Sequence, residues 1–323
     1  MSSSAVIGIV IIASAFSYTC GVLHAVGRFG NDLDMEKLNL DLAGIQNSLI
    51  GQNRADLDVN DFGEILRTKR DATKYIVGGR NASSGKHPYY GKLYMNDTFV
   101  CGGTILHQRV FLSSTDCIFS AEPSFNTIYT IVVGDFDPDV VEPEEQTLPV
   151  YGGYYTNYNR TDKMMSEDAI FWILYSNITF GSYVQPVELP SLGFAEEKAL
   201  KNGDTCYAVG FGLVSQDPDV NAIRLQELPV QVKWERVCSG YLWNSITERV
   251  WSRNYYCSIT PGSGICDMDR GGPLMCDRSD GSSVQIGIIS YGTRNCETGL
   301  SVYFRTRKIN RKYKLVLELL RKL

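Results

Sequence analysis

Val284-Gln-Ile-Gly-Ile-Ile289 is a short apolar run of the length that forms a buried β-strand. Two similar runs, Val110-Phe-Leu112 and Tyr129-Thr-Ile-Val-Val133, lie upstream of it. Clusters of Gly, Pro, Asn and Asp separate such runs, which is the pattern of β-sandwiches and β-barrels. We therefore expect an all-β domain, and no internal repeat interrupts it.

The end of the chain changes to a helical period. Apolar residues there fall on one helical face, at Ile309, Tyr313, Val316, Leu320 and Leu323, while basic residues lie off that face. This pattern predicts a C-terminal α-helix packed on the β domain. We interpret its basic residues as a solvated surface.

Composition and charge exclude several classes of function. The chain has 323 residues, of which 44% are hydrophobic and 21% are charged, so it can build a sizeable core. Its formal net charge is -5 and its pI is about 5.4, which gives no general attraction to polyanions. Nucleic acid and anionic membranes are therefore not expected partners.

The N-terminus carries an apolar run from Ala5 to Phe16, followed by small residues. It is short for a membrane span and is typical of a signal peptide, which we place at residues 1–25 without a defined cleavage site. No other stretch is expected to span a membrane. Four glycosylation sequons, at Asn81, Asn96, Asn159 and Asn177, fit a secreted, extracellular protein.

Residues 26–75 are acidic and contain no cysteine, so we interpret them as a pro-segment. The segment closes with Arg67-Thr-Lys-Arg70 and Lys74, which are exposed basic sites of the kind that processing proteases cut. A domain boundary near residue 75 follows, and the main domain covers residues 76–323.

Cysteine usage also favours secretion. The chain has nine cysteines, and removal of the signal peptide with Cys20 leaves eight between Cys101 and Cys296. An even number of cysteines in a secreted chain predicts disulfides, but the spacings alone do not select a pairing.

From Ile76 onward the sequence resembles the trypsin and chymotrypsin family of serine proteases. The resemblance rests on motifs in the family's order: Ile76-Val-Gly-Gly79, Cys101-Gly-Gly-Thr-Ile-Leu106 with Cys117, Glu167-Asp-Ala-Ile170, Gly271-Gly-Pro-Leu274 and Ser290-Tyr-Gly292. It implies two packed six-stranded antiparallel β-barrels with a C-terminal α-helix and a cleft between the barrels. It also implies four disulfides, Cys101–Cys117, Cys206–Cys276, Cys238–Cys257 and Cys266–Cys296.

The resemblance also places the catalytic positions. Peptide hydrolysis in this family needs a serine nucleophile, a histidine base and an orienting aspartate. Asp116 stands at the histidine position and Arg270 at the serine position, so only Asp168 remains of the triad. Met268 replaces the glycine that helps to bind the oxyanion. We therefore expect no catalysis and an ion pair between Arg270 and Asp116, with Arg270 as the cation between two adjacent carboxylates.

Activation in the family pairs a new N-terminal ammonium, here that of Ile76, with the carboxylate of Asp269. Tyr75 precedes Ile76, whereas a trypsin-like activator would cut after Lys74. Cleavage by a furin-like convertase at Arg67-Thr-Lys-Arg70 is the alternative. The mature N-terminus is therefore left open.

The substrate pocket is expected around Gly264, Ser290, Gly292 and Ser301. Gly264 stands where trypsins have the aspartate that selects basic residues, and Ser301 stands where they have a pocket glycine. The resemblance therefore predicts no preference for Lys or Arg.

The acidic segment from Gly134 to Gln146 resembles the calcium loop of trypsins. Its side-chain ligands would be Asp135, Glu142 and Glu145, with backbone carbonyls of Asp137 and Val140 completing an oxygen cage suited to Ca²⁺. An acidic surface loop without metal is the alternative interpretation.

Three functions are compatible with the sequence. The first is a secreted, non-catalytic serine protease homologue that acts as a binding cofactor, decoy or adaptor for extracellular proteins, including the proteases of a cascade. The second is an active serine-type endopeptidase with an unorthodox site, and the third is a secreted protein that binds a glycan or a microbial surface. The sequence names neither the partner nor the oligomeric state.

Overall fold

The structure is a computed structural model that describes most of the main domain. The described residues are 6–11, 25–28, 79–119, 127–137, 140–156, 167–190, 205–212, 224–233, 254–266, 268–278, 280–292 and 299–322, with 6–11, 25–28, 156 and 205 as backbone only. Most of the expected signal peptide and the whole of the expected pro-segment apart from residues 26–28 lie outside them, so the expected domain boundaries stay predictions.

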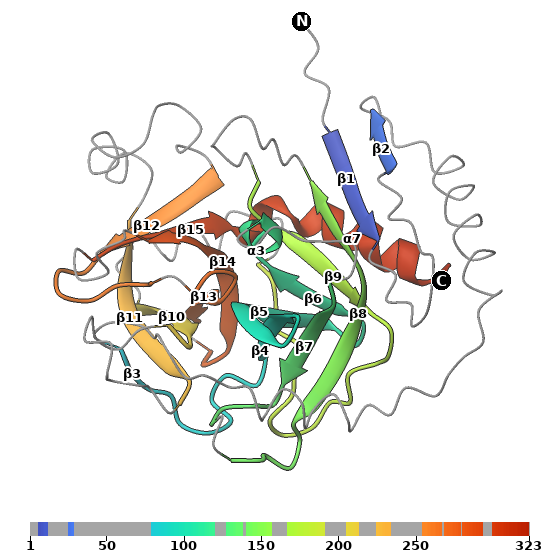
Figure 1. The fold of residues 1–323 in the computed structure, drawn as a ribbon. Helices are drawn as coiled ribbons and strands as arrows, with labels where there is room; N and C mark the ends of the chain where they lie inside the picture. The colour runs from blue at the N-terminus through green and yellow to red at the C-terminus, as the bar shows by residue number, and fades with distance from the viewer. Residues whose placement is uncertain are drawn as a thin grey trace, which may run out of the picture.

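Two closed antiparallel β-barrels of six strands each lie side by side (Figure 1). The first contains β4 (Tyr90–Met95), β5 (Thr98–His107), β6 (Val110–Ser113), β7 (Tyr129–Val133), β8 (Gln146–Thr156) and β9 (Ile170–Leu174). Pairing of β8 with β9 closes it. Its core includes the fully buried Leu93, Ile105, Phe111 and Trp172. The prediction of an all-β domain is confirmed.

The second barrel contains β10 (Thr205–Gly210), β11 (Gln226–Lys233), β12 (Tyr255–Ile259), β13 (Pro273–Asp277), β14 (Ser283–Gly292) and β15 (Leu300–Arg305). Pairing of β10 with β11 closes it, and the short β3 (Arg80–Asn81) adds to the other edge of β11. Buried Thr104 of β5 donates a hydrogen bond to buried Gln285 of β14 at 2.8 Å, which joins the two barrels.

Two N-terminal strands add to the first barrel from outside. The strand β1 (Val6–Ile11) pairs antiparallel with residues 152–156 of β8, and β2 (Ala25–Arg28) pairs with β1 (Figure 1). Residues 6–11, which belong to the apolar run expected as a signal peptide, thus lie along a barrel strand in the unprocessed chain.

The C-terminal helix α7 (Asn310–Leu320) follows the short helix η3 (Thr306–Lys308) and returns to the first barrel. Its Val316 and Leu319 are buried, and the ring of Tyr313 stacks on Phe171 with centroids 6.1 Å apart. The Tyr313 hydroxyl donates to the carbonyl of Leu106 at 2.7 Å. The predicted helix is confirmed. No helix in the described part is long and apolar enough to cross a membrane.

Disulfide bonds cross-link both barrels. Cys101 of β5 bonds Cys117, and Cys206 of β10 bonds Cys276 of β13, as the resemblance implied. Cys257 and Cys266 are disulfide-bonded as well. Their expected partners, Cys238 and Cys296, lie outside the described residues.

Candidate functional site

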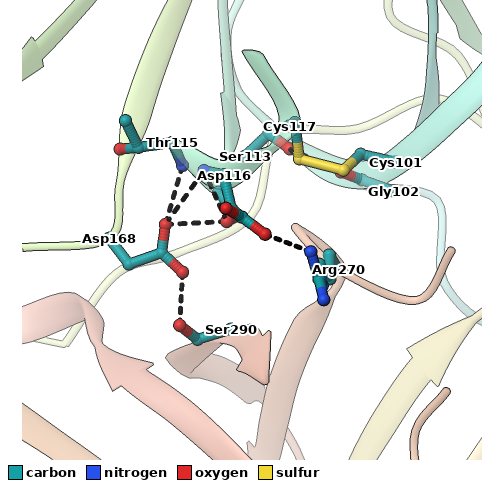
Figure 2. Close-up of a disulfide and its surroundings, with 10 residues drawn as sticks. Cys101, Gly102, Ser113, Thr115, Asp116, Cys117, Asp168, Arg270 and Ser290 are labelled. Atoms are coloured by element: carbon teal, nitrogen blue, oxygen red, sulfur yellow. Dashed lines mark hydrogen bonds and ion pairs between the residues drawn. A yellow bond between two sulfur atoms is a disulfide. The ribbon is translucent and has the colours of Figure 1, made fainter. Parts of the chain in front are cut away.

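The residues at the expected catalytic positions meet between the two barrels. Asp116 begins the short helix α3 (Asp116–Phe119), which follows β6 after Ser114 and Thr115, and Asp168 lies just before β9. From the second barrel, Arg270 lies in the turn before β13 and Ser290 lies in β14. Figure 2 shows Asp116 between Asp168 and Arg270, with the Cys101–Cys117 disulfide above and to the right of it.

Arg270 and Asp116 form the ion pair that the sequence predicts. The contact joins Nη1 of Arg270 to Oδ2 of Asp116. The two side chains are 25% and 26% exposed, so the pair lies at the rim of the site rather than in the core. Each charge neutralises the other, and solvent still reaches both groups.

Asp168 is fully buried and is stabilised by hydrogen bonds instead of by a cation. Its Oδ1 accepts from the hydroxyl of Ser114 at 2.7 Å and from the amide of Thr115 at 2.8 Å, and its Oδ2 accepts from the hydroxyl of Ser290 (Figure 2). Burial raises the pKa of Asp168, while the bonds from Ser290 and Ser114 act against that rise. The contacts that hold this carboxylate are therefore hydroxyls and amides, which corrects the view of Arg270 as the cation between both carboxylates.

The turn that carries Arg270 is fixed by its backbone. The carbonyl of Arg270 accepts from the amide of Gly102 at 2.8 Å, and the amide of Gly271 donates to Ile289 at 2.8 Å. Gly271 has φ +82°, and a Cβ there would lie 2.2 Å from the carbonyl oxygen of Gly102. Met268, two residues before Arg270, has φ 75°, in the left-handed region that favours glycine.

Asp269 is fully buried beside this turn. Its Oδ2 accepts from the amide of Cys266 at 2.8 Å, and its Oδ1 accepts from the amide of Gly212. Ile76, its expected partner after activation, lies outside the described residues.

Ile265 and Gly292 approach each other closely in the region of the expected substrate pocket. A Cβ built on Gly292 would lie 2.6 Å from the carbonyl oxygen of Ile265, the residue after Gly264. The hydroxyl of Ser301, which is fully buried, accepts from the amide of Ile265 at 3.2 Å. Position 292 therefore has no room for a side chain in this arrangement.

The loop expected to bind calcium has protein partners of its own. The carboxylate of Asp135 pairs with the ammonium of Lys92 at 2.9 Å, and both side chains are buried. Oε1 of Glu142 accepts from the amides of Phe136 and Asp137 at 3.0 and 2.8 Å.

Burial raises the pKa of Glu142, and the nearby charges of Asp135 and Glu145 add to that rise. A cation would stabilise the ionised forms of Asp135, Glu142 and Glu145, and the Lys92 ammonium is already such a cation for Asp135. No cluster of three or more metal-ligating side chains is present in the described part of the chain. Calcium binding at this loop therefore stays a prediction; Val140, expected to give a carbonyl, is 53% exposed.

Three of the four sequons are exposed. Asn81 lies in β3, Asn96 in the turn between β4 and β5, and Asn177 in the segment after β9. Asn159 lies outside the described residues. Glycosylation stays a prediction at all four.

Neither described histidine reaches the site. His87 is buried and hydrogen-bonds Glu227 at 2.8 Å and the hydroxyl of Tyr89 at 2.7 Å. His107 is exposed at the end of β5, where its ring accepts from the amide of Arg109.

Sequence reasoning missed two partners of site residues. Ser114, which supports Asp168, stands in a run of three hydroxyl residues before Asp116, and a buried carboxylate needs such donors. Lys92 is a lone cation in an otherwise apolar strand segment, which is the signal of a buried partner charge.

The comparisons with known proteins agree with this geometry. The sequence profile of the trypsin family matches residues 76–312. Ovochymase-2 of Mus musculus is 26% identical over 219 residues, which are 67% of this chain and 35% of ovochymase-2. The chain thus spans about a third of that relative.

Serine protease 41 of Homo sapiens is 27% identical over 256 residues, 73% of this chain and 76% of that protein. Among solved structures, neuropsin, a serine protease expressed in the limbic system of mouse brain, matches with a TM-score of 0.59 and 23% identity, over 75% of this chain and 100% of neuropsin.

Proposed function

Because the chain belongs to the trypsin family, we propose that it is a secreted, non-catalytic serine protease homologue that binds extracellular proteins as a cofactor, decoy or adaptor in a proteolytic cascade. The observation that carries the proposal is the ion pair of Arg270 with Asp116 at the positions where the family's mechanism needs a nucleophile and a base.

The chemistry of these two side chains supports the proposal. A guanidinium stays protonated in proteins and has no electron pair with which to attack a carbonyl. A carboxylate paired with that guanidinium is a weak base for a serine hydroxyl, whose proton is far less acidic. Asp168 keeps its place, but an orienting aspartate has nothing to orient without the imidazole.

The approach of Ile265 to Gly292 supports the proposal independently of the triad. A peptide substrate of this family inserts a side chain beside the reacting bond, and binding in that pocket positions the bond for attack. The close approach of these two residues would hinder such insertion. Met268 adds a third departure, because a side chain stands at the oxyanion position where the family has glycine.

Secretion is supported by the apolar N-terminal run, by the disulfides in both barrels and by the exposed sequons. Disulfides of this kind persist in oxidising compartments. A rigid double barrel stapled in this way can present loops to a protein partner without any chemistry.

The test is hydrolysis of a broad peptide library by the purified, secreted protein. We expect no turnover above the blank. Turnover that follows the protein through every purification step would overturn the proposal. Ser290→Ala is then the informative variant, because the Ser290 hydroxyl already donates to Asp168 and would be the nucleophile of an unorthodox site.

A second experiment tests the binding half of the proposal. The secreted protein is cross-linked in the extracellular fluid from which it was purified, and the captured molecules are identified. A protease, a protease inhibitor or a protease substrate as the partner supports a role in a cascade. Capture of glycans alone contradicts it.

A further inference from the structure

Two tyrosines lie side by side on the surface of the first barrel. Tyr175, the residue after β9, is 40% exposed, and Tyr151 of β8 is half-buried. Their rings meet edge to face, with centroids 5.2 Å apart and ring planes at 84°. Such a contact uses one face of one ring, so it leaves at least one face of the Tyr175 ring available for a further contact. We call Tyr151 and Tyr175 the tyrosine pair.

The backbone that carries Tyr175 is fixed by hydrogen bonds. The amide of Tyr175 donates to the carbonyl of Pro149 at 3.2 Å. The carbonyl of Leu174 accepts from Nε of Arg109 at 3.0 Å, and the amide of Leu174 donates to the carbonyl of Arg109 at 3.1 Å. A ring on a backbone held in this way loses little conformational freedom when a ligand packs on it.

The sequon at Asn177 follows Tyr175 after a single residue. Asn177 and Thr179 are exposed, whereas Ile178 between them is buried. The amide of Ile178 donates to the carbonyl of Gln108 at 2.7 Å, which holds the sequon against the barrel. Two residues of chain span about 7 Å at most, so the first sugar of a glycan on Asn177 begins within reach of the Tyr175 ring.

The sequon at Asn96 provides a contrast. A tyrosine stands two residues before it as well, but Tyr94 is 4% exposed and its ring packs on Phe99 with centroids 5.8 Å apart. Oδ1 of Asn96 accepts from the amide of Ile128 at 2.9 Å. The sequence spacing is the same at the two sequons, and of these two the sequon at Asn177 has the ring that a sugar can reach.

We propose that Asn177 carries an N-linked glycan whose innermost N-acetylglucosamine packs on the tyrosine pair. The flat side of a pyranose ring presents C–H groups, and the face of an aromatic ring is electron-rich, so the two attract each other as both leave water. The covalent tether makes this packing an intramolecular event. The glycan stabilises the folded protein, because the unfolded chain does not hold Tyr175 and Asn177 in this arrangement.

The covalent step uses a lipid-diphosphate-linked oligosaccharide of the secretory pathway as its co-reactant. Nδ2 of Asn177 loses one proton to solvent and forms a bond to C1 of the first sugar. The bond between C1 and the phosphate oxygen breaks, and the lipid diphosphate leaves with the electron pair. No oxidation or reduction takes place.

The inference rests on secretion, which is part of the proposed function, and not on the loss of catalysis. The first measurement is the occupancy of Asn177 in the secreted protein, by mass spectrometry of its glycopeptides. We expect a glycan there. A secreted protein with glycans elsewhere and none at Asn177 overturns this inference alone. A chain that stays inside the cell without any glycan overturns it together with secretion. Peptide hydrolysis, measured on the same sample, tests the catalytic proposal separately.

Thermal denaturation tests the packing with two variants at one position. Thr179→Ala removes the glycan and leaves Asn177 in place, whereas Thr179→Ser keeps the sequon. We expect Thr179→Ala to melt about 2–4 °C below Thr179→Ser. The difference should remain after an endoglycosidase trims each glycan to one N-acetylglucosamine, because the innermost sugar makes the contact. Equal melting temperatures, or a difference that trimming abolishes, would overturn the proposal.

Variants of Tyr175 localise the contact. In the fraction of Tyr175→Ser that carries the Asn177 glycan, the melting difference between the Thr179 variants should vanish, and Tyr175→Phe should keep it. The methyl protons of the innermost N-acetyl group should show a ring-current shift in the NMR spectrum of the wild type that is absent in Tyr175→Ser. A difference that persists in Tyr175→Ser contradicts the assignment.

The second sequon is the matched control. Thr98→Ala and Thr98→Ser remove and keep the sequon at Asn96, where the tyrosine is buried. We expect these two variants to melt at the same temperature. A difference as large as that at Thr179 would show that a glycan stabilises this protein without an aromatic partner, and would overturn the role of the tyrosine pair.

Discussion

Met268 holds a backbone conformation that glycine adopts at little cost. Its φ of 75° costs a non-glycine residue about 1–2 kcal/mol, while glycine costs about 0.5–1 kcal/mol in chain entropy. We therefore expect Met268→Gly to raise the free energy of unfolding by about 1 kcal/mol, measured by urea denaturation. A fall in stability would mean that the Met268 side chain contributes packing that outweighs the strain.

Gly271 is the matched control three residues later. It also has a positive φ, but a Cβ there would lie 2.1 Å from Oγ of Ser113 and 2.2 Å from the carbonyl oxygen of Gly102. Gly271→Ala should therefore destabilise the protein by about 3 kcal/mol, opposite in sign to Met268→Gly. Similar effects at both positions would show that φ alone does not decide the outcome.

At the same scale, the sequence predicted the pairing of Arg270 with Asp116 because opposite charges at facing positions of a recognised motif leave few alternatives. It did not predict the donors to Asp168 or the partner of Asp135. Ser114 and Lys92 are brought to these carboxylates by strand pairing and loop geometry, which no local pattern encodes. Sequence thus identified which groups are charged, and tertiary structure decided which partner each received.

Among the elements, β3 and the segment before β4 are held to the second barrel by Glu227 of β11. Its carboxylate, 3% exposed, contacts Arg80 at 2.7 Å, Lys86 at 2.7 Å and His87 at 2.8 Å. Removing the negative charge weakens these hydrogen bonds, while Arg80 and Lys86, 60% and 39% exposed, stay solvated. We expect Glu227→Gln to lower the free energy of unfolding by about 1–2 kcal/mol at neutral pH, measured by urea denaturation.

The same cluster gives a pH dependence. Burial alone would raise the pKa of Glu227 above its ordinary value of 4.5, but hydrogen bonds from His87, Lys86 and Arg80 lower it to about 2. A depressed carboxyl pKa stabilises the fold above the unfolded value and loses that contribution as pH falls toward the folded value. Wild-type stability should therefore fall between pH 4.5 and pH 2 more steeply than that of Glu227→Gln. Parallel pH profiles for the two proteins would contradict this assignment.

The acidic loop between β7 and β8 yields a prediction about calcium. Lys92 neutralises Asp135. A calcium ion held by Glu142 and Glu145 would therefore compete with the Lys92 ammonium for the carboxylate of Asp135. We expect Ca²⁺ to raise the melting temperature of Lys92→Met more than that of the wild type, by thermal denaturation with Ca²⁺ or with a chelator. A larger effect of Ca²⁺ on the wild type would show that Lys92 does not compete with the metal.

For the whole molecule, the fold followed from the sequence because the ordered motifs and cysteines fix where each barrel strand must lie, and β pairing then closes both barrels. The state of the pocket did not follow. Gly264, Ser290, Gly292 and Ser301 were predicted to line the pocket, which stays a prediction, and the close approach of Ile265 to Gly292 depends on how two loops pack. The distance between residues of two different loops depends on the tertiary packing of the whole fold, and no local sequence pattern encodes it.

One experiment separates the two causes to which the proposed loss of catalysis is attributed, the replaced triad residues and the close approach of Ile265 to Gly292. The double variant Asp116→His with Arg270→Ser restores a base and a nucleophile next to Asp168, whose carboxylate is within 3.4 Å of the Asp116 amide. A small fluorophosphonate needs the triad but little of the pocket, so we expect it to label the introduced serine. Library peptides need a side chain in the pocket, and the contact of Ile265 with Gly292 should keep their turnover at the blank. Adding Met268→Gly should speed labelling by relieving the oxyanion position, without restoring peptide turnover. Hydrolysis of peptides by the double variant, without Met268→Gly, would show that the pocket opens in solution. The replaced residues at positions 116 and 270 would then be the whole cause of the lost activity. Absence of labelling would show that Asp168 does not orient an introduced histidine.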